Sequence, residues 1–244
     1  MRSLILSDIH ANWEALEAVL AQAEGRYDRI LCCGDIVGYG ADPDRVIDWV
    51  RANVASVIRG NHDKACAGLD DLEWFHPAAK RSALWTRKVT RAENIEYLKN
   101  LPRGPETMDG FQILHGSPID EDEYLISEQD AAQTFPYVEV AVSFFGHTHV
   151  QGGFGAMNRQ VRRIPGVAGE SFGLEMEGEA LYLINPGSVG QPRDGDPRAA
   201  YAVYDEAQSR VMYYRVAYDV AGAQKKILGA GLPEVLATRL SVGN

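Results

Sequence analysis

The stretch that decides the fold is Leu4-Ile5-Leu6-Ser7-Asp8-Ile9-His10, in which a short apolar run ends at two side chains able to bind a metal. The same pattern returns where Ile30 to Cys33 ends at Gly34-Asp35, and where Ala55 to Ile58 ends at Gly60-Asn61-His62-Asp63. Between these runs, apolar residues recur with helical spacing over residues 16–23 and about 44–53. This β-α-β-α-β order predicts parallel strands joined by helical crossovers.

Residues 64–100 are helical in tendency and carry no strand signal. Thr90 followed by Glu93 predicts a capping box that opens a helix ended before Pro102. We expect a mainly helical insertion here. It either leans over the site or is a plain pair of packing helices.

The second half of the chain is rich in predicted strands. Their ranges are 111–114, 138–145, 180–184, 200–204 and 211–216, and helices are predicted over 220–228 and 233–240. Two sheets that face each other would accommodate all of these strands. At 244 residues, the length fits a single domain over 1–244.

Composition narrows the classes of function. The formal charge is −10, so the average surface repels nucleic-acid backbones and anionic membranes. No stretch reaches the ~18 apolar residues that span a bilayer, and the N-terminus has no signal-peptide layout, so we expect a cytoplasmic protein. The three cysteines, Cys32, Cys33 and Cys66, have no CxxC spacing and fit buried thiols in a reducing compartment.

Potential metal ligands gather at five strand ends, each beside a glycine or a short turn. The segments are Asp8-Ile9-His10, Gly34-Asp35, Gly60-Asn61-His62-Asp63, His115-Gly116 and Gly146-His147-Thr148-His149. Ligands bind outside the carboxyl ends of strands in open α/β sheets, so five such ends can converge on one crevice. Residues i and i+2 of a strand point the same way, so Asp8 with His10, and His147 with His149, can each offer two ligands to one side.

The candidate ligands combine nitrogen and oxygen without thiolate. They are Asp8, His10, Asp35, Asn61, His115, His147 and His149. This set suits Mn, Fe, Zn, Co or Ni and suits Ca poorly. Seven ligands are too many for one tetrahedral ion but fit two ions that share a carboxylate, as in displacement at phosphorus. Two carboxylates against two dications would leave a net positive charge that attracts a phosphate anion.

Alternative interpretations remain for single residues. Any one of these histidines alone could be a satisfied core or turn residue, but five at strand ends favour a site. His76 lies outside the segments and is interpreted as structural, and Asp63 as a turn residue or a support for the ligands. Trp74 and Phe75 could stack a nucleobase, although core packing is the simpler interpretation.

The order DxH, GD, GNHD, HG and GHTH resembles the calcineurin-like metallophosphoesterases, in their small prokaryotic phosphodiesterase or phosphatase form. The stretch from Asn185 to Arg193 is also similar to a turn of small bacterial and archaeal relatives. The resemblance implies an α/β (α+β) fold, a four-layer αββα sandwich of two mixed sheets flanked by helices. It also implies one metal on Asp8, His10, Asp35 and His149, and a second on Asn61, His115 and His147, with Asp35 bridging.

The resemblance also implies a reaction. A hydroxide bridging the two metals attacks phosphorus in line, and His62 bonds a phosphoryl oxygen or protonates the leaving alkoxide. Protein phosphatases of this family continue the second motif as GDxVDRG, but here Gly38 and Tyr39 stand where the Asp and the Arg would be. Without that Arg a dianionic monoester loses a bidentate partner. Arg193 could supply a replacement cation, or could form a structural salt bridge.

These observations predict a metal-dependent phosphoesterase, a phosphodiesterase that acts on small phosphorylated molecules. Alternatives are a phosphomonoesterase, a dinucleoside polyphosphate hydrolase, and a non-catalytic protein-binding module of the same fold. A nuclease is disfavoured because no basic stripe is visible. No membrane partner is expected, and an oligomer is compatible with the β-rich second half.

Overall fold

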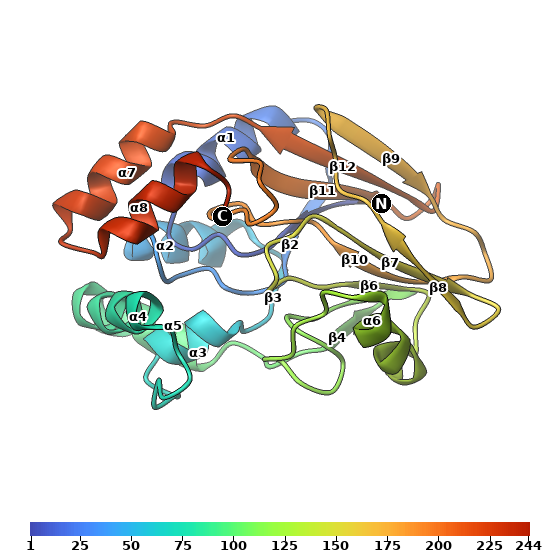
Figure 1. The fold of residues 1–244 in the computed structure, drawn as a ribbon, viewed down its shortest axis with the longest axis horizontal. Coiled ribbons are helices and arrows are strands. Elements are labelled where there is room, and N and C mark those ends of the chain that lie inside the picture. The colour runs from blue at the N-terminus through green and yellow to red at the C-terminus, as the bar shows by residue number, and fades with distance from the viewer.

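Two six-stranded mixed β-sheets pack against each other in the computed structural model, which describes residues 1–244 (Figure 1). The first sheet has the order β3-β2-β1-β11-β12-β9, with bounds Ser56–Val57, Arg29–Cys32, Arg2–Leu6, Ala199–Asp205, Arg210–Val216 and Ser171–Glu175. The second has the order β4-β5-β6-β10-β7-β8, with bounds Glu106–Met108, Phe111–Ile113, Val142–Phe144, Leu181–Asn185, Gly152–Met157 and Gln160–Ile164.

The strand directions follow from the connections. β1, β2 and β3 are parallel, as the β-α-β-α-β pattern predicted, and they are joined by the helices α1 (Trp13–Ala23) and α2 (Pro43–Asn53). β5, β6 and β10 are also parallel, whereas β11, β12 and β9 pair antiparallel. Parallel strands that share a direction bring their carboxyl ends to one edge of each sheet.

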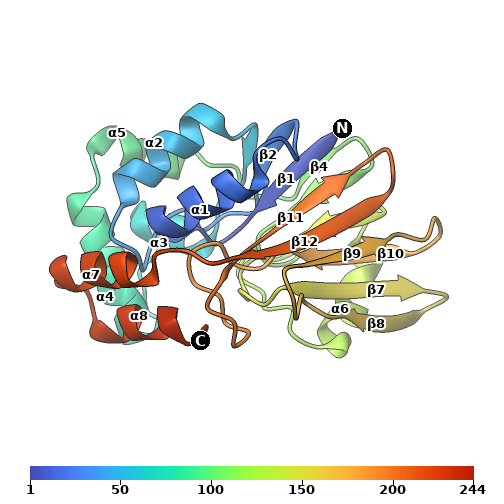
Figure 2. The same cartoon turned by 90° about the horizontal axis from the view of Figure 1, so that it is seen from above.

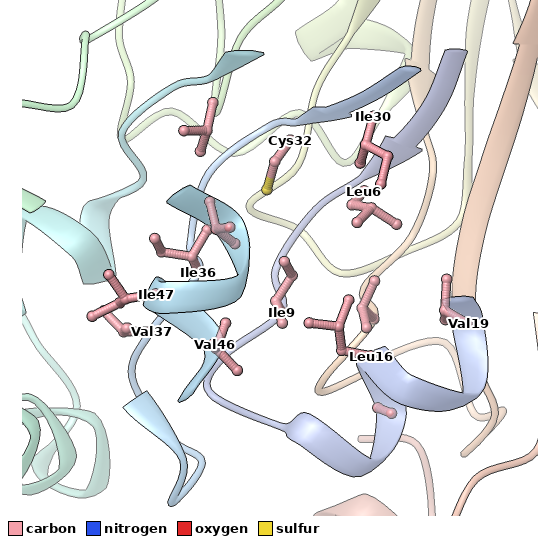
Figure 3. Packing of buried hydrophobic residues seen from close by; sticks show 14 of the residues in the cluster. Leu6, Ile9, Leu16, Val19, Ile30, Cys32, Ile36, Val37, Val46 and Ile47 are labelled. Carbon is pink, nitrogen blue, oxygen red and sulfur yellow. The ribbon is translucent and has the colours of Figure 1, made fainter. Parts of the chain in front are cut away.

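Successive side chains of β1 point to opposite faces of the sheet and pack into two different hydrophobic cores. Leu4 and Leu6 face helices α1 and α2, in the core of Figure 3, while Ile5 faces the second sheet and joins the core between the two sheets. On the far side of the second sheet, α6 (Glu128–Thr134) packs on β7 and β8. The predicted layering of two mixed sheets flanked by helices is therefore confirmed.

Residues 64–100 are mainly helical, as predicted, and contain the second half of α3 (Asn61–Cys66) and all of α4 (Pro77–Val89) and α5 (Ala92–Lys99). The predicted capping box is wrong, because Arg91 is the N-cap of α5 and Thr90 is the C-cap of α4. The carboxylate of Asp44, from α2, accepts the Arg91 backbone N–H at 3.1 Å. A tertiary contact has thus replaced the local one.

The second half departs from the sequence pattern in detail. The strand predicted over 138–145 is only Val142–Phe144, since Phe135–Tyr137 forms the short 3-10 turn η1. The elements β4, β7, β8, β9 and α6 were not predicted. The tail forms α7 (Val220–Gly229), α8 (Glu234–Thr238) and the turn η2 (Arg239–Ser241), and Figure 2 shows α7 and α8 at the same end as α4. None of the helices combines the length and the apolar character needed to cross a bilayer.

Candidate metal centre

Ligand-bearing turns from both sheets meet at one place. Asp8 and His10 follow β1, Asp35 follows β2 and Asn61 follows β3, all in the first sheet. His115 follows β5, and His147 and His149 follow β6, in the second sheet. The five strand ends singled out in the sequence therefore converge.

The ligand atoms form two groups that share Asp35. The first holds Asp8, His10, Asp35 and His149, and the second holds Asp35, His115 and His147, with ligand atoms within 4.8 Å of one another in each group. All of these residues are buried. Asn61 adjoins the second group, with its Oδ1 3.2 Å from His115 Nε2.

Asp35 lies between the groups. Its Oδ2 is 3.6 Å from His10 Nε2 on one side and 3.5 Å from His115 Nε2 on the other. One geometric expectation differs from this arrangement, because His147 and His149 fall in different groups instead of facing one side. Both have left-handed backbone, so the alternation of an extended strand does not apply to them.

Each histidine in the groups is oriented by a backbone carbonyl. His10 Nδ1 donates to Val37 O at 3.0 Å, His149 Nδ1 to Gln191 O at 2.6 Å and His115 Nδ1 to Cys33 O at 2.7 Å. His147 uses the opposite nitrogen, Nε2, toward Asp122 O at 3.1 Å. Histidine ligands of metals are held in this way, with the second nitrogen left for the ion.

The donor set requires a cation. With both Nδ1 atoms donating to carbonyls, the Nε2 atoms of His10 and His149 present lone pairs to each other at 3.0 Å. The carboxylate oxygens Asp8 Oδ2 and Asp35 Oδ2 are buried without a hydrogen-bond partner. Lone pairs that face each other in a buried site repel unless a positive charge lies between them, so the residues fit metal ions.

The electrostatics agree with this reading. Burial lowers the pKa of His10 and His149 well below the usual value, and that of His147 to about 3, so these rings are neutral, as ligands must be. Burial also lowers the pKa of His115, but the neighbouring Asp35 outweighs it and raises that pKa to about 10. In the protein alone, His115 thus carries a proton that neutralises Asp35.

The backbone is strained at the site. Asp8, His10, Asp35, His147 and His149 all have positive φ between 51° and 64°, which costs energy for residues other than glycine. Gly60 meets a different need, because a Cβ there would lie 2.0 Å from Asp35 Oδ1. Only glycine lets this turn approach the shared carboxylate.

Asp63 is a support for the ligands. Its buried carboxylate accepts the backbone N–H groups of Asp35, Ile36, Val37 and Gly60 at 2.8 to 3.2 Å. It therefore fixes the turn that presents Asp35. Its place directly after Asn61 and His62 was the only sequence signal for this role.

The loop of residues 185–193 forms hydrogen bonds with ligand-bearing turns of both sheets. Ser188 Oγ donates to Asp8 O at 2.8 Å and accepts the Gln191 N–H at 2.8 Å. Asn185 Nδ2 donates to Gly146 O at 2.9 Å, and Gln191 O holds His149. The sequence showed that this loop is similar to a turn of small relatives, but it did not indicate what the loop does.

His62 faces a cavity of about 560 Å³. Its ring packs on Tyr39, His10 and Phe75, with centroids 4.3, 4.9 and 5.1 Å away, and its Nδ1 has no partner. Burial lowers the pKa of His62 to about 4. A Cβ at Gly38 would lie 2.6 Å from His62 Nδ1, so the Asp of the protein-phosphatase motif would not fit this backbone.

The helical segment lines this cavity, through Asp70, Trp74, Phe75, His76, Ala78 and Ala79. Part of this segment therefore borders the cavity, while its helices also pack on one another and on the core. Core packing is wrong for Trp74, which is 96% exposed, whereas Phe75 is partly buried. His76 caps α4 by accepting the Ala78 N–H and joins neither ligand group.

Arg193 lines the same cavity. Its Nη2 donates to Tyr39 Oη and to Gln191 Oε1, both at 3.2 Å, and no carboxylate pairs with it. The alternative of a structural salt bridge is therefore wrong. The thiols of Cys32, Cys33 and Cys66 are all buried and unpaired, and Cys33 reaches the site only through its carbonyl.

Comparisons with known proteins agree with the fold and the motifs. Residues 1–209 match the family model described as a calcineurin-like phosphoesterase superfamily domain. An uncharacterised protein of Methanocaldococcus jannaschii is 37% identical over 246 residues, which cover 98% of this chain and 97% of that protein. A metallophosphoesterase crystal structure from Sphaerobacter thermophilus is 40% identical with a TM-score of 0.87, covering 100% of this chain and 99% of that one. A hypothetical protein of Pyrococcus horikoshii shares the fold, at 21% identity and a TM-score of 0.81, covering 100% of this chain and 98% of that one.

Proposed function

The chain belongs to the calcineurin-like phosphoesterase superfamily, and from this premise we propose that it is a metal-dependent phosphodiesterase acting on small molecules. The observation that carries the proposal is the pair of ligand groups sharing Asp35 beside the cavity of about 560 Å³. Two ions held there would activate water for attack on phosphorus and stabilise the charge that develops. Mn, Fe, Zn, Ni and Co all suit the nitrogen and oxygen donors.

We assign the seven ligands as follows. Asp8, His10, Asp35 and His149 would hold one ion, and Asn61, His115 and His147 the second, with Asp35 shared. The carbonyl contacts of the four histidines fix their ring orientations before any ion arrives. Such preorganisation lowers the cost of assembling the site.

His62 would act on the substrate. It lines the cavity, and its backbone N–H donates to Asp35 Oδ1 at 2.8 Å, which fixes the residue beside the shared ligand. Because burial lowers its pKa, the ring is neutral near pH 7 and its function is to hydrogen-bond a phosphoryl oxygen or to pass on a proton. Arg193 lines the same cavity and donates to Tyr39 Oη at 3.2 Å, so it would also contact the phosphoryl group.

A diester fits better than a monoester for two reasons. No carboxylate stands behind His62 to hold it as an imidazolium, since Gly38 leaves no room for one. Tyr39 stands where the protein-phosphatase motif has its arginine, so a dianion loses that bidentate partner. A diester carries one negative charge and needs less compensation. Trp74, exposed at the cavity, favours a dinucleoside polyphosphate as the second candidate.

The test is to strip the protein with a chelator and restore Mn, Fe, Zn or Ni singly. Turnover of bis-para-nitrophenyl phosphate is then compared with that of para-nitrophenyl phosphate. We expect metal-restored activity with kcat/KM for the diester at least ~10-fold above that for the monoester. A monoester preference would contradict the diester assignment, and no turnover with two metals bound would favour a binding module of the same fold.

Asp35→Asn provides the site-specific variant, with Asp109→Asn as the same change at an exposed carboxylate. Loss of the shared carboxylate should reduce both metals by elemental analysis, whereas Asp109→Asn should retain both. Full occupancy in Asp35→Asn would contradict the assignment of a shared ligand.

A further inference from the structure

A second arginine, Arg239, lines the cavity together with Arg193. Arg239 begins η2 at the end of α8, far from Arg193 in the chain, and both line the cavity together with His62. The two meet at one acceptor, because Gln191 Oε1 lies 3.2 Å from Arg193 Nη2 and 3.5 Å from Arg239 Nη1. The fold thus places two guanidinium groups side by side.

No side-chain carboxylate neutralises this pair. The Nε atoms of Arg193 and Arg239 are both buried without a hydrogen-bond partner, and neither side chain forms an ion pair. Burial, and after it the charge of Arg193, lower the pKa of Arg239. Two like charges side by side repel each other unless an anion binds between or beside them.

The acidic side chains that line the cavity already have a cationic partner. Asp70 and Asp122 both pair with Lys64 Nζ, the former at 3.9 Å. Lys64 therefore compensates their charges. The cavity thus combines aspartates that have a cationic partner with two arginines that have no carboxylate partner.

The phosphate to be cleaved does not account for both arginines. Arg193 contacts Tyr39, whose ring packs on His62 and His10, so Arg193 belongs to the floor of the cavity. Arg239 contacts the same Gln191 but forms no hydrogen bond to Tyr39, the residue that packs on His62. Two dications against Asp8 and Asp35 already leave a charge of roughly +2 for a phosphodiester of charge −1.

We propose that Arg239, together with Arg193, binds a second anionic group of the substrate, a phosphate or carboxylate other than the phosphoryl group that is cleaved. A guanidinium presents a planar fork that matches either anion. The inference rests on the proposed function and deepens it, since it defines the substrate as a phosphoester that carries an additional negative charge at one end.

A matched pair of diesters tests this directly. 4-Nitrophenyl phenyl phosphate and 4-nitrophenyl 4-carboxyphenyl phosphate have the same leaving group and differ by one remote carboxylate. We expect the wild-type holoenzyme to favour the carboxylate compound by ~10-fold in kcat/KM and Arg239→Gln to abolish that preference. Arg239→Lys should keep part of it, and Arg162→Gln, at an exposed arginine of β8, should keep all of it.

Two results would overturn the inference. One is a wild-type enzyme without preference for the carboxylate compound. The other is an Arg239→Gln variant in which kcat/KM falls equally for both diesters, because Arg239 would then serve the cleaved phosphate or the fold. Thermal unfolding of each variant separates the last two cases.

Equilibrium binding keeps this inference distinguishable from the proposed function. Phenylphosphonate and 4-carboxyphenylphosphonate are not hydrolysed, and calorimetry on the metal-loaded protein compares their affinities. A preference of ~10-fold for the carboxylate compound that disappears in Arg239→Gln supports the second anion site even if no diester is turned over. Equal affinities in the wild type would overturn it even if turnover is fast.

Discussion

At the scale of single residues, His62 separates substrate chemistry from metal binding. Its side chain faces the cavity, while only its backbone N–H reaches Asp35. We expect His62→Asn to retain both metals by elemental analysis and to lower kcat on the diester by ~10²-fold or more, because the group that stabilises or protonates the reacting oxygens is lost.

The matched control is His76→Asn. His76 is the one histidine outside the ligand segments, and asparagine also caps a helix, so α4 keeps its N-terminal acceptor. His76 also lines the cavity, so KM is the parameter that this change would alter, whereas kcat should stay near that of the wild type. Unchanged turnover in His62→Asn would remove His62 from the mechanism.

The sequence could identify residues of the site only where the side chain itself is the candidate ligand or substrate contact. Asp8 and Asp35 stand at strand ends beside turn residues, and that pattern is visible in the letters alone. The carbonyls of Cys33, Val37 and Gln191 orient three histidines, but any residue type has a carbonyl, so no pattern marks them. Arg239 carries no motif either, because its place depends on how the tail packs.

At the scale of elements, the loop of residues 185–193 holds the turns after β1 and β6 in fixed positions relative to each other. Ser188 is buried and bonds both Asp8 O and the Gln191 N–H. We expect Ser188→Ala to lower the free energy of unfolding by about 1–3 kcal/mol, because two buried backbone groups lose their partner. Denaturant unfolding of the metal-free protein measures this.

Metal occupancy distinguishes a role in the site from a general loss of stability. Ser188→Ala should also lower the metal affinity of the ligand group that contains His149. Ser188 fixes Gln191, and the carbonyl of Gln191 orients the His149 ring. Ser171→Ala, at an exposed position of β9, is the control and should change neither property. A destabilised Ser188→Ala protein with unaltered metal affinity would limit the loop to a structural role.

Helices and strands could be predicted from the sequence where apolar residues recur with the period of a helix or form a continuous buried run. β1, β2 and their helices were found because apolar runs alternate with helical stripes. β7, β8 and β9 were missed because they contain glycine and exposed polar residues, as in Gly152–Met157, and are specified by pairing with neighbouring strands. α5 was found, but its start depends on Asp44 from α2, which local sequence does not reveal.

At the scale of the whole molecule, both ligand groups draw on both sheets. Asp8, His10 and Asp35 come from the first sheet, and His115, His147 and His149 from the second. We propose on this ground that residues 1–244 form one domain, with the helical segment as part of it. A metal bound at either group would join the sheets and stabilise the folded state by mass action.

The metal-free protein should therefore depend on pH in a way that the loaded protein does not. Asp35 raises the pKa of His115 to about 10, above the value of about 6.5 expected in the unfolded chain. A raised pKa means that the stabilisation is complete below pH 6.5 and is lost as pH rises toward 10, because the proton that neutralises Asp35 leaves. We expect the thermal midpoint of chelator-treated protein to fall by roughly 5 °C or more between pH 6.5 and 9.5, relative to metal-loaded protein. Bound metal replaces that proton, so the loaded protein provides the baseline for groups outside the site, while Asp8, whose pKa burial raises to about 7, loses its proton at the low end of this range. A parallel decline of the two forms would show that the His115 and Asp35 pair does not hold the sheets together through its charge.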